Sequence, residues 1–379
     1  MYYIQGVSIY YYKIMRILIN NFVKDGGAPT LTLGMAKGFL ENNHEVYLVL
    51  SKYIDNKEEF LKVFGEDKIC FIDTHSSKKE LLNKSIKFIF NKELKAFCKS
   101  HTFDIVISTM YHSWNLYFQK RVVAKKKFLI VHDPIPHSGV SFLKGKKFTR
   151  QYKKAENVIV LSKKFVPIMV EKYKFKQNEV FYMNHGRIEI THGNIDSAID
   201  MDKNKTNFLF FGFICKYKGL DVLADAYKKL KEEKDDVALY IVGSGNFEEY
   251  KDKYNGLKDV YIYNKYIKNE EICNFFNGNN VVVVAPYIDA TQSGIVAIAI
   301  DFKKPIIITD TGGLTEQLDD GKAGLICKPG DYCDLYEKML SITDNKKLYL
   351  EQEKLMEECS KKVEWKYICN KFTKKVGEL

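Results

Sequence analysis

Short apolar runs alternate with amphipathic segments along most of the chain, and this alternation limits the fold more than any other feature of the sequence. The runs are rich in β-branched and aromatic residues, and their hydrophobicity is continuous, as expected of strands buried on both faces. Amphipathic segments between such strands are typical of βα units that build a parallel sheet covered by helices. The sequence therefore predicts an α/β fold.

The expected strands fall into two groups, one in each half of the chain. The first group is 16–20, 45–50, 69–72, 105–109, 127–131, 158–161 and 180–183. The second group is 207–211, 238–242, 260–263, 280–285, 305–309 and 324–327. Helices are expected at 220–233, 270–276 and 331–341, with a further one from the 290–294 stretch to just before Pro305.

One segment, 188–205, interrupts this rhythm with Thr, His, Gly, Asn and Asp and no strand pattern, so we expect an interdomain linker there. At 379 residues the chain is long enough for two domains. We expect an N-terminal extension at 1–14, with Met15 as an alternative start, and Rossmann-like domains at 15–195 and 196–361. Two parallel sheets joined in this way would face a central cleft at the carboxyl ends of their strands.

The composition limits which classes of protein and which partners are expected for this chain. The eight cysteines lack CxxC pairs and metal-ligand spacing to histidine, which favours reduced, mostly buried thiols. No apolar run reaches the roughly 18 to 20 residues that span a bilayer, and the N-terminal stretch has no cleavage-site pattern, so we expect a cytoplasmic protein. The net charge of +11 favours acidic partners, such as phosphates or an anionic membrane surface.

Two lysine-rich segments are candidate docking surfaces. Residues 141–176 hold eleven Lys and Arg against two Glu, and 77–97 interleave large apolar side chains with lysines, a pattern suited to an anionic membrane. A solvated face for the first segment, and a helix packed on its own sheet for the second, are the plain alternatives. Nucleic acid is not expected, because no stacking aromatics are interleaved with the first segment.

Two loops in the first half carry residues suited to binding. Gly26 and Gly27 lie between a strand and a helix, where backbone amides can approach an anion, although a tight turn explains them equally well. His132, Asp133 and His137 lie on a proline-stiffened loop after the strand at 127–131. Such a loop is suited to a binding cleft. A Ser-His-Asp nucleophilic site is not expected, because no GxSxG turn occurs.

The second half opens with a strand, then Gly212, Lys216 and Lys218, ahead of a helix. This arrangement supplies backbone donors and a point charge for a phosphate group. Gly243 ends the next strand in a similar glycine turn. Neither a GxxxxGK[ST] loop nor a complete GxGxxG is present, so a Walker loop and a dinucleotide fingerprint are not predicted.

A third phosphate-compatible stretch is Gln292, Ser293 and Gly294 at a helix start, and Glu316 follows the Gly-Gly of the next loop. Small hydroxylated residues and glycine at a helix N-terminus can form an anion nest. Each of these turns, taken alone, is also common in loops that bind no ligand. Their repetition at the strand ends of one sheet favours a nucleoside diphosphate.

Several stretches of the second half resemble those of retaining glycosyltransferases of family four, the group-one type: FFGFICKYKGLD, YIVGSG, PYIDATQSG, KKPIIITDTGGLTE and GLICKPGD. The resemblance extends from Met15 to Phe372, with thinner matches in the first half at the glycine and histidine loops, at NVIVLSKKF and at residues 184–186. It implies the GT-B fold, with the C-terminal helix 362–379 completing the first domain. The ATQSG form is similar to a subgroup of bacterial polysaccharide enzymes.

The resemblance also implies roles for the residues above. The catalytic set would be His132, Asp133 and Lys218, with His132 near the transferred sugar and Lys218 neutralising the donor diphosphate. The donor and phosphate contacts would come from Gly26, Gly27, Gly212, Lys216, Gly243, Gln292, Ser293, Gly294 and Glu316, and His137 would belong to an acceptor loop. No metal and no separate cofactor would be needed, because lysine and helix N-termini stabilise the departing diphosphate, and the anomeric configuration would be retained.

Two departures from the family pattern stand out. Phe213 occupies the place of an arginine that shares the diphosphate with the lysine, and Lys216 is its expected substitute. The paired glutamates of the family should fall near Ala290 and Ile298, and neither of these two residues is acidic. The usual contacts to sugar and ribose hydroxyls are therefore missing.

The leading hypothesis is a glycosyltransferase that moves a sugar from a UDP- or GDP-sugar to a lipid-linked, lipopolysaccharide or capsule-type acceptor, peripheral on the inner face of the cytoplasmic membrane. The alternatives are a non-catalytic GT-B subunit that supports an active partner, motivated by the two departures, and a sugar-nucleotide epimerase on the same fold.

Overall fold

The computed structural model describes residues 3–4, 7–8, 13–75, 77–135, 142–190 and 199–378. Contacts divide the chain into two compact units. The first unit comprises residues 1–130, 154–158 and 369–379, and the second comprises 131–153 and 159–368. The expected extension and the domain bounds at 15–195 and 196–361 stay predictions.

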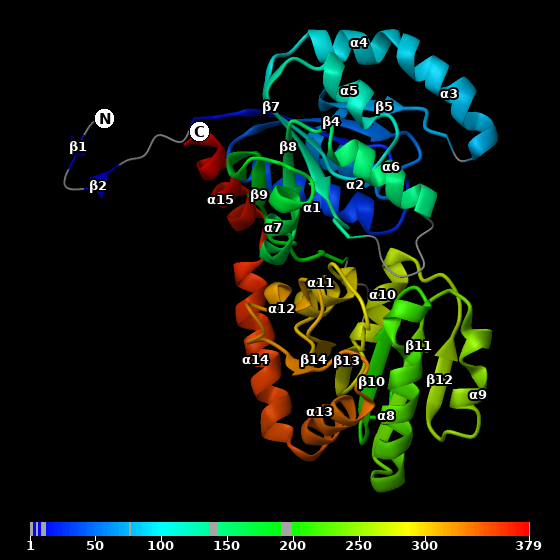
Figure 1. Cartoon of the computed structure of the whole chain (residues 1–379). Helices are drawn as coiled ribbons and strands as arrows, with labels where there is room; N and C mark the ends of the chain where they lie inside the picture. Colours follow the sequence, from blue (N-terminus) through cyan, green and yellow to red (C-terminus); the bar gives the residue numbers. More distant parts are fainter. Residues whose placement is uncertain are drawn as a thin grey trace. The chain divides into compact units, whose positions relative to one another are not determined.

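A seven-stranded sheet has the order β5-β4-β3-β6-β7-β8-β9, drawn in the blue-to-green part of Figure 1. Its strands are β3 (Arg16–Asn21), β4 (Glu45–Ser51), β5 (Ile69–Ile72), β6 (Phe103–Ser108), β7 (Ala124–Val131), β8 (Asn157–Val160) and β9 (Val180–Tyr182). The helices between these strands are α1 (Gly27–Leu40), α2 (Lys57–Phe64), α3 (Lys78–Phe90), α4 (Lys92–Lys99), α5 (Asn115–Arg121), α6 (Phe142–Tyr152) and α7 (Val166–Glu171), and the last helix of the chain, drawn in red, is α15 (Trp365–Gly377). Two short strands, β1 (Tyr3–Ile4) and β2 (Val7–Ser8), pair in antiparallel.

A six-stranded sheet has the order β12-β11-β10-β13-β14-β15, and all of its pairs are parallel. Its strands are β10 (Thr206–Phe211), β11 (Val237–Val242), β12 (Val260–Tyr263), β13 (Val281–Ala285), β14 (Ile306–Thr309) and β15 (Leu325–Cys327). The helices are α8 (Leu220–Glu233), α9 (Lys251–Tyr254), α10 (Asn269–Phe276), α11 (Gly294–Asp301), α12 (Leu314–Gln317), α13 (Tyr332–Asp344) and α14 (Lys346–Lys362).

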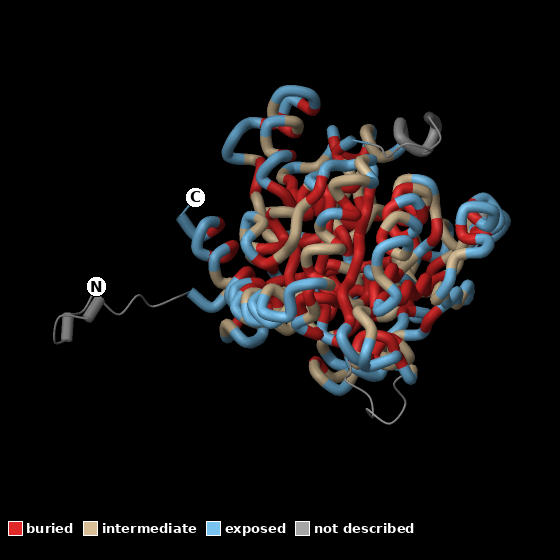
Figure 2. Tube along the Cα trace, turned by 90° about the horizontal axis from the view of Figure 1, so that it is seen from below, coloured by how far each residue is buried: buried red, intermediate tan, exposed pale blue. Residues whose placement is uncertain are grey.

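The predicted α/β class, with two parallel sheets, is confirmed. Every expected strand is present, and its bounds lie within a few residues of the predicted ones. Continuous hydrophobicity predicts β11 and β13 correctly, because all of their residues are buried, but the edge strand β12 has Tyr261 and Ile262 exposed. Figure 2 colours the buried residues red along the Cα trace. All eight cysteines are free, and six of them are buried, as the scattered spacing predicts.

The sequence pattern predicts one continuous amphipathic segment at 77–97, and the structure divides this segment in two. It forms two helices, α3 and α4, with a break at Asn91, whose backbone is extended at ψ 113°. The side chain of Asn91 accepts a 2.8 Å hydrogen bond from the amide of Leu94 and so begins α4. Asparagine is among the preferred N-cap residues, because its side chain satisfies an amide that no helical carbonyl can reach.

The strand order creates a switch point in each sheet. β3 lies between β4 and β6, and β10 lies between β11 and β13, so the connections on either side of each strand depart in opposite directions. Open α/β sheets bind ligands in the crevice that such a reversal leaves at the carboxyl ends of the strands. A ligand site is therefore expected at the loops that follow β3 and β10.

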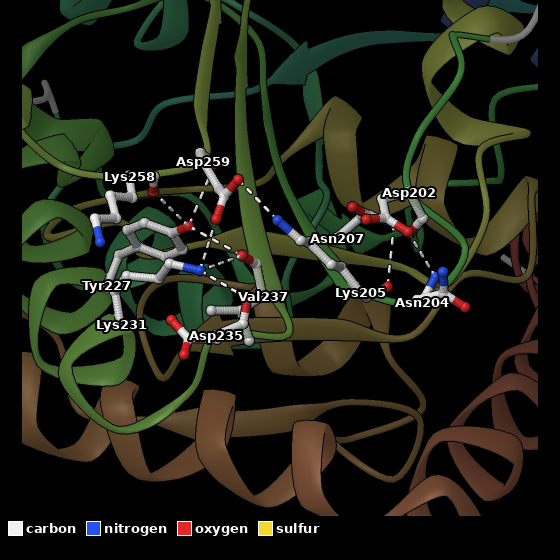
Figure 3. Close-up of polar contacts among 10 residues, drawn as sticks. All are labelled: Asp202, Asn204, Lys205, Asn207, Tyr227, Lys231, Asp235, Val237, Lys258 and Asp259. Carbon is white, nitrogen blue, oxygen red and sulfur yellow. Dashed lines mark hydrogen bonds and ion pairs between the residues drawn. The ribbon is translucent and has the colours of Figure 1, made fainter.

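At the opposite, amino-terminal edge of the six-stranded sheet, Asp259, which precedes β12, is paired with Lys205, which precedes β10, and with Lys231 of α8 (Figure 3). Its two carboxylate oxygens each lie 2.7 Å from an ammonium nitrogen, one of Lys205 and one of Lys231. Hydrogen bonds from these two lysines lower the pKa of Asp259. The hydroxyl of buried Tyr227 lies 3.1 and 3.2 Å from the carbonyl oxygens of Lys258 and Asp259. The network stabilises the amino-terminal edge of this sheet.

Replacing Asp259 by asparagine is expected to lower the free energy of unfolding by on the order of 1 kcal/mol at neutral pH, because two partly buried lysines lose their shared counter-ion. Asparagine tolerates the φ of 55° at this position, so charge is the main change. Because the folded-state pKa lies below the ordinary 3.8, the stabilisation is present above that value and lost as pH falls through the folded pKa. Urea denaturation of both proteins at about pH 7 and about pH 3 measures the difference. A deficit that persists unchanged in acid would contradict the electrostatic origin.

Candidate functional site

The loop after β10 presents Lys218 at the switch point of the six-stranded sheet. Lys216–Lys218 form a single 3-10 turn, and Gly219 follows in the left-handed conformation at φ 69°. A Cβ on Gly219 would lie 2.0 Å from the carbonyl oxygen of Pro286, so only glycine allows this loop to approach the loop after β13 so closely. The amide of Ile288 donates to the carbonyl of Tyr217 at 2.8 Å and holds the two loops together.

Tyr287 fixes the position of the Lys218 ammonium. Its ring is 1% exposed, and the ammonium nitrogen lies 3.6 Å from the ring centroid, within range of a strong cation–π contact. The hydroxyl of Tyr287 lies 3.0 Å from that of Ser293, the N-cap residue of α11. One buried aromatic side chain therefore connects the cation to a helix N-terminus, and both favour a negatively charged group.

Gln317 joins this arrangement to the next loop of the sheet. Its side-chain oxygen accepts a 2.9 Å hydrogen bond from the amide of Ser293, and its side-chain nitrogen donates to the Ser293 carbonyl at 3.0 Å. Gly294, the first residue of α11, is exposed. The N-terminus of α11 is thus held by buried hydrogen bonds while its first helical residue remains accessible.

The loops after β10 and β11 meet backbone to backbone. Gly212 has φ 129° and Gly243 has φ 141°, and a Cβ on Gly243 would lie 1.9 Å from the carbonyl oxygen of Gly212. The amide of Gly212 donates to the carbonyl of Val242 at 2.9 Å. Close approach therefore requires glycine at Gly243, whereas at Gly212 it is the positive φ that favours glycine.

Glu316 and Gln292 are engaged by the residues that follow β8. The carboxylate of Glu316 accepts hydrogen bonds from the Ser162 hydroxyl at 2.8 Å and from the Lys163 amide at 2.8 Å, and it is 8% exposed. The side-chain nitrogen of Gln292 donates to the Leu161 carbonyl. Both residues position loops in this arrangement, and their contacts with a donor stay a prediction.

The loop after β7 places His132 and Asp133 half-buried, and Asp133 accepts a hydrogen bond from the hydroxyl of Thr291. This contact brings the predicted histidine loop to the stretch that precedes α11. Burial lowers the pKa of neighbouring His185 to about 4, with a smaller contribution from the charge of His132. His185 is therefore neutral near pH 7. His137, predicted in the same loop, lies outside the described residues.

In the first unit, Gly26 and Gly27 begin α1 after β3, as predicted. Gly26 is the N-cap at φ 71°, and both glycines are exposed, with nothing within 4 Å of an added Cβ. The open space leaves the first amides of a 14-residue helix accessible to a ligand.

Lys216 is exposed, and Phe213 at the position of the family's arginine is 62% exposed. Sequence reasoning missed Tyr287 and Gln317, although Tyr287 stands within the PYIDATQSG stretch.

A separate cavity of about 450 Å³ lies on the β11–β12 face, beside segment 199–205 and away from the Lys218 loop, and its lining includes Tyr240 and Tyr261.

Comparison with known proteins finds a family match in the second half of the chain. Residues 193–362 match the family model described as glycosyl transferases group 1. The chain is 26% identical over 199 residues to an uncharacterized glycosyltransferase of Methanocaldococcus jannaschii, covering 51% of this chain and 54% of the relative. It is 29% identical over 154 residues to a D-inositol 3-phosphate glycosyltransferase of Arthrobacter sp., covering 38% and 36%. The chain thus spans about half of the first relative's length and about a third of the second's.

Among solved structures, that of Anabaena HepE in complex with UDP and glucose superimposes with a TM-score of 0.68 at 14% identity, covering 96% of this chain and 100% of HepE. At that identity the likeness shows the fold alone. The predicted GT-B architecture is confirmed in its two parallel sheets of seven and six strands.

Proposed function

We propose that this chain is a glycosyltransferase that moves a sugar from a nucleoside diphosphate sugar to an acceptor. The observation that carries the proposal is the ammonium of Lys218, held 3.6 Å above buried Tyr287 at the switch point of the six-stranded sheet. A fixed cation beside the N-terminus of α11 is suited to a diphosphate, whose charge grows as it leaves the sugar. The match of 193–362 to group 1 glycosyl transferases supports the same chemistry.

Within this proposal the donor is a UDP- or GDP-sugar, transfer retains the anomeric configuration, and no metal ion takes part. HepE was solved in complex with UDP and glucose, which supports a uridine nucleotide for this chain. His132 and Asp133 would lie by the transferred sugar, because their loop contacts the stretch that precedes α11. The exposed amides at Gly26 and Gly27 are suited to an anionic group of a ligand.

The direct test combines nucleotide binding with product analysis. The purified chain is titrated with UDP and GDP, then incubated with their sugars and a membrane lipid extract, and donor and acceptor products are separated by mass spectrometry. Binding of one diphosphate together with a sugar added to the extract would support the proposal. Absence of any nucleotide binding would favour the non-catalytic subunit, and a changed donor sugar without acceptor would favour the epimerase.

We further propose that the chain works on the inner face of the cytoplasmic membrane, through α3. Leu82, Ile86 and Phe90 recur every four residues on this helix and are 74, 50 and 67% exposed. Lys79 and Lys87 of α3 are exposed, the ammonium of Lys95 in α4 lies 5.5 Å from the centroid of the Phe90 ring, and Phe88 and Leu94 are buried. An exposed apolar stripe with a cationic border fits an anionic bilayer surface. No helix among the described residues is long and apolar enough to cross a membrane.

Replacing both Leu82 and Phe90 by serine is expected to weaken binding to phosphatidylglycerol vesicles on the order of a hundredfold, since each inserted side chain contributes about 1.5 to 3 kcal/mol. Vesicle flotation measures the change. The matched control replaces Leu350 and Tyr367, which are 54% and 62% exposed on α14 and α15, by serine. Equal weakening by the control pair, or binding of the original chain that ignores salt and lipid charge, would contradict the docking role of α3.

A further inference from the structure

Three ammonium groups converge on one tyrosine ring at the carboxyl edge of the seven-stranded sheet. Lys24 follows β3, Lys52 and Tyr53 follow β4, and Lys84 comes from α3. Their ammonium nitrogens lie 4.8, 4.9 and 5.4 Å from the centroid of the Tyr53 ring, which is 45% exposed. Exposed like charges repel, so such convergence is favourable only where other groups hold the lysines or a counter-ion joins them.

Asp73, which follows β5, is the carboxylate that joins two of these lysines. It forms ion pairs with Lys52 at 3.4 Å and with Lys84, and it accepts a 2.8 Å hydrogen bond from the Tyr53 hydroxyl. Burial alone would raise the pKa of Asp73, but the bonds from Lys84 and Tyr53 outweigh it and lower the pKa to about 2. Asp73 is therefore ionised near pH 7 and offsets part of the positive charge of the three lysines.

Asp55, Asp25 and His75 also belong to this edge of the sheet. Asp55 lies near Asp25, and burial together with the charge of Asp25 raises the pKa of Asp55. The Nε2 atom of His75 is buried and has no hydrogen-bond partner among the residues that the structure describes. Burial, then the charges of Lys24 and Lys84, lower the pKa of His75, so its ring is neutral near pH 7 and retains a polar atom for a ligand.

The cluster occupies the end of the sheet where α/β proteins bind ligands, because β5, β4 and β3 are consecutive in the sheet and end there together. We propose that Lys24, Lys52 and Lys84 bind a phosphate of the acceptor, with Tyr53 and Asp73 holding the three side chains in place. The inference rests on the proposed glycosyl transfer and names the acceptor class as phosphorylated. The phosphate belongs either to a soluble sugar phosphate or to the diphosphate of a lipid carrier.

The test uses inorganic pyrophosphate, titrated calorimetrically into the whole chain with UDP at saturation, so that the nucleotide site is filled. The double variant K52Q/K84Q is expected to bind pyrophosphate about ten- to a hundredfold more weakly, since it loses two charge-assisted contacts. The control K62Q/K99Q removes two exposed lysines of α2 and α4, and it should bind as the original chain does. K24Q, which leaves the Asp73 ion pairs intact, should weaken binding in the same direction.

UDP binding, measured on each variant, separates this inference from the proposed function. A chain that binds UDP, but whose pyrophosphate affinity is unchanged in K52Q/K84Q, overturns the phosphate site and leaves the transferase standing. Two competition arms then identify the source of the phosphate. Displacement of pyrophosphate by glucose 1-phosphate assigns a soluble acceptor, and displacement by undecaprenyl diphosphate in phosphatidylcholine vesicles assigns a lipid carrier. Displacement by neither would overturn the acceptor assignment.

Discussion

The variant Lys218→Met is expected to lose at least about a hundredfold in kcat/KM for the donor, while its melting temperature stays close to that of the original chain. Methionine keeps an apolar stem against the Tyr287 ring and removes only the charge that faces the proposed diphosphate. The ammonium contributes more as charge develops on the leaving group than in the ground state, so kcat should fall with kcat/KM. Steady-state kinetics and UDP titration of the same preparation measure both effects.

Lys216→Met is the matched control for this prediction. Lys216 occupies the same 3-10 turn but is exposed, and Lys218 is the one whose ammonium lies against Tyr287. A smaller loss in Lys216→Met would agree with the geometry. Equal losses in the two variants would mean that the turn acts through its total charge, and the assignment of the diphosphate to Lys218 would fail.

The variant Gly243→Ala is expected to lower the free energy of unfolding by about 3 kcal/mol or more, the largest stability effect among these predictions. The added Cβ would lie 1.9 Å from the carbonyl oxygen of Gly212, and neither backbone can yield without separating the loops after β10 and β11. The Lys218 loop follows Gly212 directly, so UDP affinity should fall together with stability. Urea denaturation and UDP titration measure the two.

Gly256→Ala isolates the contribution of that overlap. Gly256 has φ 78°, so alanine is strained there as well, but nothing lies within 4 Å of the added Cβ. Backbone strain alone should lower the free energy of unfolding by about 1 to 2 kcal/mol, with UDP affinity unchanged. If the two alanine variants unfold with the same free energy, the close approach at Gly212 is not what makes Gly243 necessary.

The strands were predictable because buried parallel strands have a continuous apolar signature. The bounds of β5 and β12 agree with the expected 69–72 and 260–263, and helix α8 agrees with 220–233. The break of segment 77–97 was not predicted, because lysine and apolar residues continue on both sides of Asn91. There the N-cap bond to Leu94 decides the local geometry, and a pattern of hydrophobicity does not record it.

The candidate site was predictable only where it is local in sequence. The glycine turns and Lys218 follow strands directly, and that order is visible in the chain. The contacts of Tyr287 with Lys218, of Gln317 with Ser293, and of Tyr53 with Lys24 and Lys84 join residues from separate loops. They depend on which strands are neighbours in the sheet, and sequence periodicity does not determine strand order.

The paired hydrogen bonds between Gln317 and Ser293 have a consequence for engineering this chain. The loop after β13 cannot be exchanged alone, because a grafted loop that moves the backbone amide and carbonyl at position 293, or places proline there, would leave polar atoms of the buried Gln317 amide unsatisfied. The backbone carbonyl of Tyr287 accepts a hydrogen bond from the hydroxyl of Thr309, so Tyr287 is also connected to the end of β14. A transplant meant to change the donor therefore has to carry residues 287–317 as one cassette, with β14 inside it.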